Sequence, residues 1–333
     1  MVDLSTSYLG IPITNPIIVG SCGLTASVDS VQALEQNGAG AVVLKSIFEE
    51  EIALEFEKLL REESPDGRYT DHFDYFDYVI KDNNLKAYSN LIAGCKQAVP
   101  IPVIASINCT YSHEWISFAK TLEEAGADAI ELNMFFLPSD LSRSSEEQEQ
   151  AYFHVIERVK TELSLPIALK ISSYFSSLGH IIKQLSQTGI DGLVLFNRFM
   201  QPDINIDTFQ VLPGATLSTP EEHLFPLRWI ALMADQIDCD LAASTGIHNG
   251  NAVIKHLLAG AQTVQVVSAL YKHGNGHLQT MLAELRNWME TKGFERIDQF
   301  RGKMSQAHIA NPATYERAQY MKQFGSHNAG DEG

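Results

Sequence analysis

The chain has few cysteines and few basic residues for its length. Its 333 residues include four cysteines, and 24 lysines and arginines stand against 41 acidic residues, for a formal net charge of −17. The cysteines form no C-x-x-C pair and have no zinc-type spacing, so we expect a reducing compartment and neither a structural metal nor an iron–sulfur centre. The acidic balance makes nucleic acids and anionic membranes poor partners.

Long apolar runs and targeting signals are also missing. No window reaches the roughly 18 apolar residues of a membrane-spanning helix. Residues 1–21 lack a basic region followed by an apolar stretch and a cleavage site, which favours a cytoplasmic location. No G-x-G-x-x-G nicotinamide fingerprint opens the chain, so the electrons of a redox reaction would leave through a small oxidant or another protein.

What the chain does contain is eight short apolar runs with amphipathic segments between them. Four of these runs follow a glycine that ends the preceding segment, as in NGAG and AGAD. Strands that alternate with helices predict a parallel sheet, and eight units allow it to close into a (β/α)8 TIM barrel. We expect one barrel domain over 1–324 and a polar, disordered tail over 325–333. The predicted strands are Pro16–Gly20, Ala41–Lys45, Pro102–Ile107, Ala129–Asn133, Pro166–Ile171, Gly192–Asn197, Asp240–Ser244 and Thr263–Val267.

Two connections are longer than the usual βα loop of about 2–6 residues. Residues 46–84, after the second strand, are acidic and then aromatic, and residues 198–219 follow the sixth strand. The acidic run fits a solvated helix face, whereas the aromatic residues fit either lid packing or an oligomer contact. We therefore expect a homo-oligomer, with a dimer as the simplest case. Residues 297–324 are predicted to form a helical extension.

The stretch from Leu241 to Gly274 organises the candidate site. It contains a strand, a small-residue turn at Thr245–Gly246 and a helix, followed by a second strand and a second turn at Ser268–Ala269. Bare backbone N–H groups after the seventh and eighth strands of a barrel are a common phosphate site. Either turn alone could be an ordinary tight βα turn.

Polar residues close the other strands, where a barrel carries its chemistry. A lysine in a barrel mouth is costly to bury, so Lys45 and Lys170 favour contact with a ligand, with a salt bridge as the alternative. Asparagines both donate and accept, which suits a planar heterocycle bearing C=O and N–H groups, although each could simply anchor a loop. These strand-end residues are Gly20, Ser21, Lys45, Ser46, Asn108, Asn133, Lys170, Asn197, Arg198, Ser244, Thr245 and Ser268.

Several of these motifs together resemble the dihydroorotate dehydrogenase family of FMN flavoproteins: NPIIVGSCG, GAVVLKS, ADAIELN, PIALKISSYF, LVLFN and STGIHNGNAVIKHLLAGAQTVQVVSALYKHG. The resemblance implies FMN across the barrel mouth, with its phosphate on the turns at Thr245–Gly246 and Val267–Ser268. It implies that Lys170 contacts the flavin pyrimidine and stabilises the reduced ring, and that Asn197 orients the substrate. The positions matching residues that line flavin or substrate are Gly20, Ser21, Lys45, Ser46 and Asn133.

The chain departs from that family beyond Asn133. The family usually reads N-x-S-C-P-N there and so supplies the catalytic base, whereas this chain reads NMFFLPSD. Ser139 is the nearest replacement base, with Asp140 beside it, and both could instead cap a following turn. The apolar loop predicts a less polar pocket in which dihydroorotate is oxidised slowly. A Schiff-base lyase or aldolase, and a flavin-binding protein with decayed catalysis, are the alternatives.

Overall fold

The computed structural model describes residues 2–48, 73–108, 114–134 and 137–316. Its strands are β1 (Thr6–Tyr8), β2 (Ile11–Ile13), β3 (Ile17–Val19), β4 (Ala41–Val43), β5 (Ile47–Phe48), β6 (Val103–Asn108), β7 (Ala129–Met134), β8 (Ile167–Ile171), β9 (Gly192–Leu195), β10 (Pro202–Asn205), β11 (Gln210–Pro213), β12 (Asp240–Ala243) and β13 (Thr263–Val266). Its α-helices are α1 (Val28–Gln36), α3 (Phe73–Ala98), α4 (Glu114–Glu124), α5 (Ser145–Glu162), α6 (Leu178–Ser186), α7 (Leu224–Met233), α8 (Gly250–Ala259), α9 (Ser268–His273), α10 (His277–Lys292) and α11 (Ala313–Glu316). Short 3-10 turns are η1 (Gly23–Thr25), η2 (Pro220–His223) and η3 (Ile297–Gln299).

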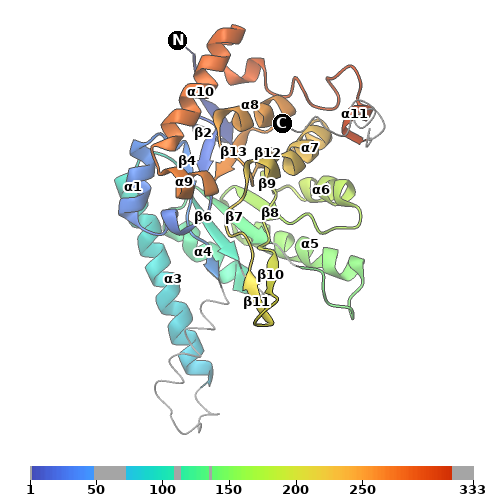
Figure 1. Ribbon diagram of the computed structural model, residues 1–333. Helices are drawn as coiled ribbons and strands as arrows, with labels where there is room; N and C mark the ends of the chain where they lie inside the picture. Colours follow the sequence, from blue (N-terminus) through green and yellow to red (C-terminus); the bar gives the residue numbers. More distant parts are fainter. Residues whose placement is uncertain (1, 49–72, 109–113, 135–136, 317–333) are drawn as a thin grey trace.

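Eight parallel strands close into a barrel, and the helices surround it (Figure 1). The ring runs β3, β4, β6, β7, β8, β9, β12 and β13, and β13 pairs with β3 to complete it. The predicted (β/α)8 fold is therefore confirmed, and each of the eight predicted strands overlaps one barrel strand, with β6 and β7 extending one residue beyond their predicted ends.

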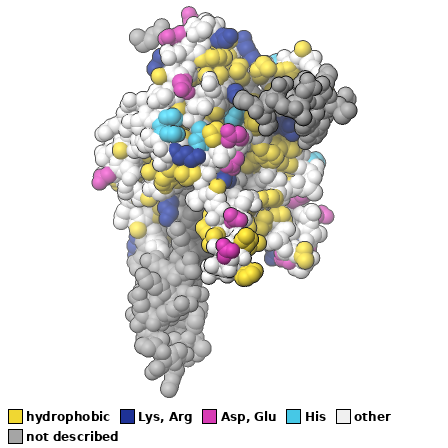
Figure 2. All heavy atoms as spheres, in the orientation of Figure 1, with side chains coloured by type: hydrophobic (Ala, Val, Ile, Leu, Met, Phe, Trp, Pro, Cys, Tyr) yellow, Lys and Arg dark blue, Asp and Glu magenta, His cyan; other side chains and the backbone are white. Residues whose placement is uncertain are grey.

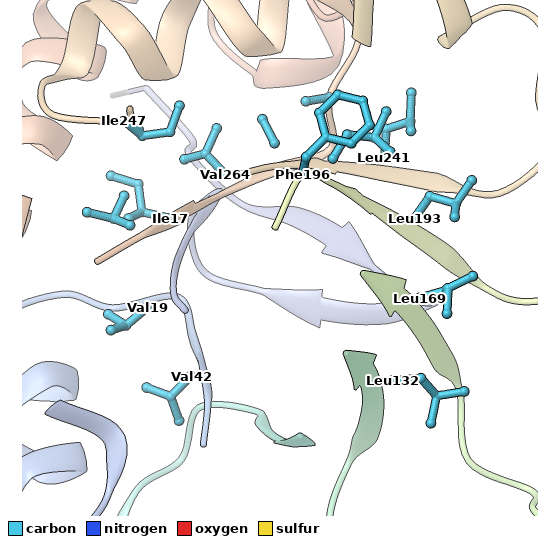
Figure 3. Packing of buried hydrophobic residues seen from close by; sticks show 14 of the residues in the cluster. Ile17, Val19, Val42, Leu132, Leu169, Leu193, Phe196, Leu241, Ile247 and Val264 are labelled. Carbon is cyan, nitrogen blue, oxygen red and sulfur yellow. The ribbon is translucent and has the colours of Figure 1, made fainter. Parts of the chain in front are cut away.

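Successive side chains of each strand point to opposite faces, which divides the apolar residues into two cores. The outward set packs against the helices and includes Ile17, Val42 and Leu132, which Figure 3 shows arranged around the strands. The inward set is smaller and is rich in alanine, valine and isoleucine. Burial on both faces explains why the strands read as continuous apolar runs.

The β1–β2 hairpin closes the N-terminal end of the barrel. Tyr8 and Leu9 pack among the inward residues of the strands, including Ala168 and Ala242. At Gly192 an added Cβ would lie 2.5 Å from Leu9 Cδ2, so the first residue of β9 must be small for the hairpin to seat there. The opposite, C-terminal end is left to form the site.

The two insertions after strands are more ordered than predicted. Helix α3 begins at Phe73, within the connection predicted over residues 46–84, and the second insertion contains the antiparallel β10–β11 hairpin. Exposed apolar side chains on and beside this hairpin, including Ile204, Phe209 and Val211, gather with acidic residues on one face of the molecule (Figure 2). The acidic run and Tyr69 of the first insertion lie outside the described residues.

The continuous helix expected from residue 297 is wrong for the part that the structure describes. After η3 the chain makes turns and forms only the one-turn helix α11 before residue 317. Gly302 takes a left-handed φ of +74° and Pro312 lacks a backbone donor, which interrupts helical hydrogen bonding. Instead, the N–H groups of Gly302 and Met304 donate to carbonyls near the end of α8. The predicted tail, 325–333, lies outside the described residues.

Candidate functional site

A polar cavity of about 190 Å³ lies at the C-terminal end of the barrel. Nine residues that the sequence pointed to line it, and they come from five different strand ends: Ser21, Lys170, Asn197, Arg198, Ser244, Thr245, Gly246, Val267 and Ser268. The lining does not include Gly20, Lys45, Ser46, Asn133 or Ser139. The structure thus brings the two small-residue turns and the strand-five lysine together around one space.

Lys170 stands in a buried polar network between three strands. Its Nζ donates to Gln265 Oε1 at 2.7 Å and lies 3.6 Å from Glu131 Oε1, while Gln265 Nε2 donates to Glu131 Oε2. Lys170 is only 7% exposed and Glu131 only 1%. Lys170 therefore has a salt-bridge partner and also a place in the cavity wall, while its contact with a ligand stays a prediction.

Glu131 and Gln265 were missed because only the last polar residue of each strand was considered. Glu131 lies two residues before Asn133, and Gln265 lies two residues before Val267. Residues two apart on a strand share a face, so both point into the barrel one layer below the mouth. The alternation of side chains along a strand was therefore the sequence signal that could have identified Glu131 and Gln265.

Asn133 and Asn197 meet although Asn133 does not line the cavity. Asn197 Nδ2 donates to Asn133 Oδ1 at 2.7 Å, from the end of β9 to the end of β7. Asn133 is buried, and Asn197 borders the cavity. This hydrogen bond fixes the orientation of both side-chain amides, and it leaves the NH₂ group of Asn133 and the side-chain carbonyl of Asn197 outside the pair.

Three serines form a hydrogen-bonded chain beside the cavity. Ser21 Oγ lies 3.1 Å from Ser46 Oγ, which lies 2.6 Å from Ser106 Oγ, and Ser46 N–H donates to Ser21 Oγ. Next to them, a Cβ added at Gly20 would lie 3.0 Å from Val267 Cγ2 and 3.3 Å from Gln265 Oε1. Gly20 therefore allows β3 to approach the cavity floor closely. Lys45 is half-buried, and its N–H donates to Thr25 O.

Both residues of the first turn have a left-handed backbone. Thr245 has φ +79° and Gly246 has φ +76°, and Thr245 Oγ1 donates to Phe196 O at 3.2 Å. A β-branched residue is rarely found in this region, so the turn at Thr245 is strained. A Cβ at Gly246 would lie 2.2 Å from His223 N, so this glycine is required by packing against η2, quite apart from any ligand.

Ser218 links the two turns and was not identified in the sequence. Its N–H donates to Ser268 Oγ at 3.0 Å, and its Oγ accepts from Gly246 N–H at 3.4 Å. Its Oγ also lies 3.1 Å from His248 Nε2, and its carbonyl accepts from Lys272 Nζ. Burial, then the Lys272 charge, lowers the pKa of His248, so this imidazole is neutral at pH 7. Ser218 lies in a long connection with no periodic pattern to single it out.

Ser139, the proposed replacement base, is exposed and outside the cavity lining. Asp140 accepts hydrogen bonds from the Ser142 hydroxyl and N–H, which hold the pKa of Asp140 below its usual range and make it a weaker base. Neither residue caps α5, because Ser144 does so, but Asp140 stabilises the turn before it. Residues 135 and 136, which precede this loop, lie outside the described residues.

A larger groove of about 680 Å³ lies between the loops that follow β7 and β8. Leu137, Tyr152, Tyr174 and Phe175 line it, but neither Lys170 nor either small-residue turn does. We therefore place the candidate site in the smaller cavity, where the cation and the turns converge. Within the described ranges, no helix is both long and apolar enough to cross a membrane.

The chain is similar in sequence to proteins of one family. Residues 76–289 match the model of the family described as "Dihydroorotate dehydrogenase". The chain is 27% identical over 310 residues to the dihydroorotate dehydrogenase B (NAD(+)) catalytic subunit of Thermoplasma volcanium, which covers 91% of this chain and 98% of that protein. It is 25% identical over 325 residues to the NAD-dependent dihydropyrimidine dehydrogenase subunit PreA of Escherichia coli K12, and 24% identical over 331 residues to the chloroplastic dihydropyrimidine dehydrogenase (NADP(+)) of Arabidopsis thaliana; each match covers 90% of this chain and 76% of the relative. Since the matched region is well over half of the chain and holds most of the barrel, this protein belongs to the dihydroorotate dehydrogenase family, as a divergent member.

Proposed function

We propose that this protein is an FMN-dependent oxidoreductase that oxidises a CH–CH bond in a reduced pyrimidine-like ring. The observation that carries the proposal is the ammonium of Lys170, which is buried in the wall of a cavity whose other walls are two strand-end turns. A cation facing a cavity suits a bound group on which negative charge develops. The family match and the relatives' names, all of them dehydrogenases, support an oxidoreductase.

The residues of the cavity fit FMN in two respects. The turns at Thr245–Gly246 and Val267–Ser268 offer backbone N–H groups and a hydroxyl suited to a phosphate. Gly20 keeps the cavity floor low where a Cβ would crowd Val267. At about 190 Å³ the cavity is smaller than the roughly 300–1,000 Å³ of typical cofactor sites, so by itself it would enclose only part of FMN.

When bound, FMN supplies the acceptor for the hydride removed from the substrate. The chain's own residues bind and orient. Lys170 would stabilise negative charge on the flavin, and the side-chain carbonyl of Asn197, which the bond to Asn133 orients, would offer an acceptor to a planar ring. The serine chain from Ser21 to Ser106 fixes the backbone between β3 and β6.

The Schiff-base alternative is disfavoured by the same network. Gln265 accepts a hydrogen bond from the Lys170 nitrogen at 2.7 Å and Glu131 lies 3.6 Å from it, so this nitrogen is already engaged within the barrel. Schiff-base chemistry requires the neutral amine.

The substrate is tested by anaerobic reduction of bound FMN with dihydroorotate and, separately, with dihydrouracil. Because the described part of the loop after β7 brings no base to the cavity, we expect dihydroorotate to react slowly, by about 10²–10⁴ relative to an enzyme with a positioned base. Fast reduction by dihydroorotate would contradict this. A large loss on Ser139→Ala would assign the base to Ser139, with Ser142→Ala in the same loop as the matched control. Absence of reduction by either ring would favour a flavin-binding protein with decayed catalysis.

We also propose that the protein forms a homo-oligomer and that residues 1–324 form a single domain. The exposed apolar side chains of the β10–β11 hairpin support a homo-oligomer, because contiguous exposed apolar surface commonly marks an interface. Size-exclusion chromatography with light scattering tests it, and a monomer at micromolar concentration would contradict it. The single domain over 1–324 would appear as one cooperative unfolding transition.

A further inference from the structure

Glu131 is a buried carboxylate that the proposed chemistry does not itself require. It is 1% exposed, comes from the interior face of β7 and does not line the cavity. Its Oε2 accepts from Gln265 Nε2, but among the described residues its Oε1 has no hydrogen-bond donor. The nearest cation to that oxygen is Lys170 Nζ, at 3.6 Å, beyond hydrogen-bond distance.

This arrangement is a poor stabiliser of the barrel. Burying a carboxylate is costly, and an ion pair offsets that cost only when the remaining polar atoms are satisfied. Nearer the N-terminal end of the barrel the inward positions are filled by small or β-branched apolar residues, such as Ala129 two residues earlier on β7. Packing alone therefore gives no reason for a carboxylate at this depth.

The network does define how Lys170 is held. An ammonium has three donors and a flexible stem. One N–H is directed to Gln265 Oε1 and the Glu131 carboxylate lies beside the nitrogen, while Lys170 and Gln265 both border the cavity. The orientation of the Gln265 amide is fixed in turn, because its NH₂ donates to Glu131 and its oxygen accepts from Lys170.

We propose that Glu131 is a positioning residue that acts through Lys170: it orients the ammonium toward the cavity and offsets part of its positive charge. The effect on the flavin rests on the proposed flavin function. The positioning of Lys170 by Glu131 does not depend on that function. By offsetting the cation, Glu131 weakens the stabilisation of negative charge on the reduced flavin. Glu131 therefore makes the bound flavin harder to reduce than Lys170 alone would.

The first arm of the test needs no flavin. In the full-length protein, the acetylation rate of Lys170 by acetic anhydride is measured by peptide mass spectrometry, relative to Lys292 on α10. Glu131→Gln removes the carboxylate charge that holds the Lys170 nitrogen beside it and keeps an acceptor for Gln265, so we expect acetylation of Lys170 to become at least about tenfold faster. Glu131→Met, of similar volume, replaces it if the amide variant does not fold. An unchanged rate overturns the proposal, whatever the flavin content.

The second arm measures the midpoint potential of FMN in the loaded protein. Glu131→Gln should shift it to a more positive value, by a tenfold change in the reduction equilibrium or about 30 mV for a two-electron couple. Lys170→Met should shift it in the opposite direction, and Glu131→Gln should have little further effect in the Lys170→Met background. Glu123→Gln, a carboxylate on the outside of α4 bonded to Ser164, is the matched control.

The two arms of the test distinguish failure of the proposed function from failure of the proposed role of Glu131. Protein that binds no FMN overturns the proposed function, yet the acetylation arm still decides whether Glu131 controls Lys170. A potential that is unchanged or more negative in Glu131→Gln overturns the effect on the flavin. A full effect of Glu131→Gln in the absence of Lys170 shows that the carboxylate does not act through the lysine.

Discussion

The side-chain amide of Asn197 donates a hydrogen bond to Asn133 Oδ1 over 2.7 Å, although the two residues belong to strands separated by β8. The bond spans the strand that carries Lys170 and fixes both amides at one side of the barrel mouth. Removing one partner leaves a buried amide oxygen without this donor, which is more costly than losing an exposed hydrogen bond.

We therefore expect Asn197→Ala to lower kcat/KM for the reduced-ring substrate while FMN remains bound. The expected loss is about tenfold, since a neutral hydrogen bond contributes about 0.5–1.5 kcal/mol and 1.36 kcal/mol is tenfold in rate. Steady-state kinetics measure the loss and visible absorbance measures the flavin. Asn287→Ala, on the exposed face of α10, should match the parent. Equal loss of flavin and activity would instead place Asn197 among the residues that hold the cofactor.

At position 245 a glycine variant should be more stable than an alanine variant, which is the reverse of the usual order. The φ of +79° at Thr245 is unfavourable for any residue with a Cβ, while both replacements lose the hydroxyl bond to Phe196 O. Thr245→Gly should thus be more stable than Thr245→Ala, by about 1–2 kcal/mol. Urea unfolding measures the difference. At Thr161, near the end of α5, the order should be the normal one, with alanine about 1 kcal/mol more stable. The same order at both sites would show that Thr245 is not held in the left-handed region.

His256 predicts acid sensitivity of the fold. Burial, then the charges of His223 and Lys255, lowers its pKa from 6.5 to about 3. Below pH 6.5 His256 binds a proton in the unfolded chain but stays neutral in the folded chain. The stability contributed by neutral, buried His256 is therefore fully present above pH 6.5 and is lost as the pH falls toward 3. At pH 5, proton uptake by His256 in the unfolded chain alone lowers the free energy of unfolding by about 2 kcal/mol.

Urea unfolding of His256→Leu at pH 7 and pH 5 tests this prediction. Neither ring nitrogen of His256 has a hydrogen-bond partner among the described residues, so an apolar replacement should be tolerated at pH 7 and should remove most of the loss at pH 5. His180→Leu, exposed on α6, should retain the pH dependence of the parent. An equally large loss in His256→Leu would assign the acid sensitivity to other groups.

The barrel could be predicted because its strands are buried on both faces and its helices end at glycines. Both features are written in the residue types, as Gly126 and Gly260 illustrate with their positive φ values. The turns after Ile297 could not be predicted, since they depend on contacts with elements distant in sequence, such as the bonds from Gly302 and Met304 to the end of α8.

The site divides in the same way. Lys170 and the two turns were found because they end apolar runs, where barrel chemistry lies. Glu131 and Gln265 were hidden inside those runs, and the position of Ser218 over both turns depends on the path of a long connection. Ser139 was placed by proximity in sequence to Asn133, which does not bring its side chain to the cavity.

The central claim is that the cavity between Lys170 and the two turns holds FMN. The most direct measurement is the visible absorption spectrum of the protein as purified, with mass spectrometry of the small molecule released on denaturation. We expect a flavin spectrum and an amount of FMN equimolar with the chain. A colourless protein that remains without flavin after incubation with excess FMN would contradict the claim.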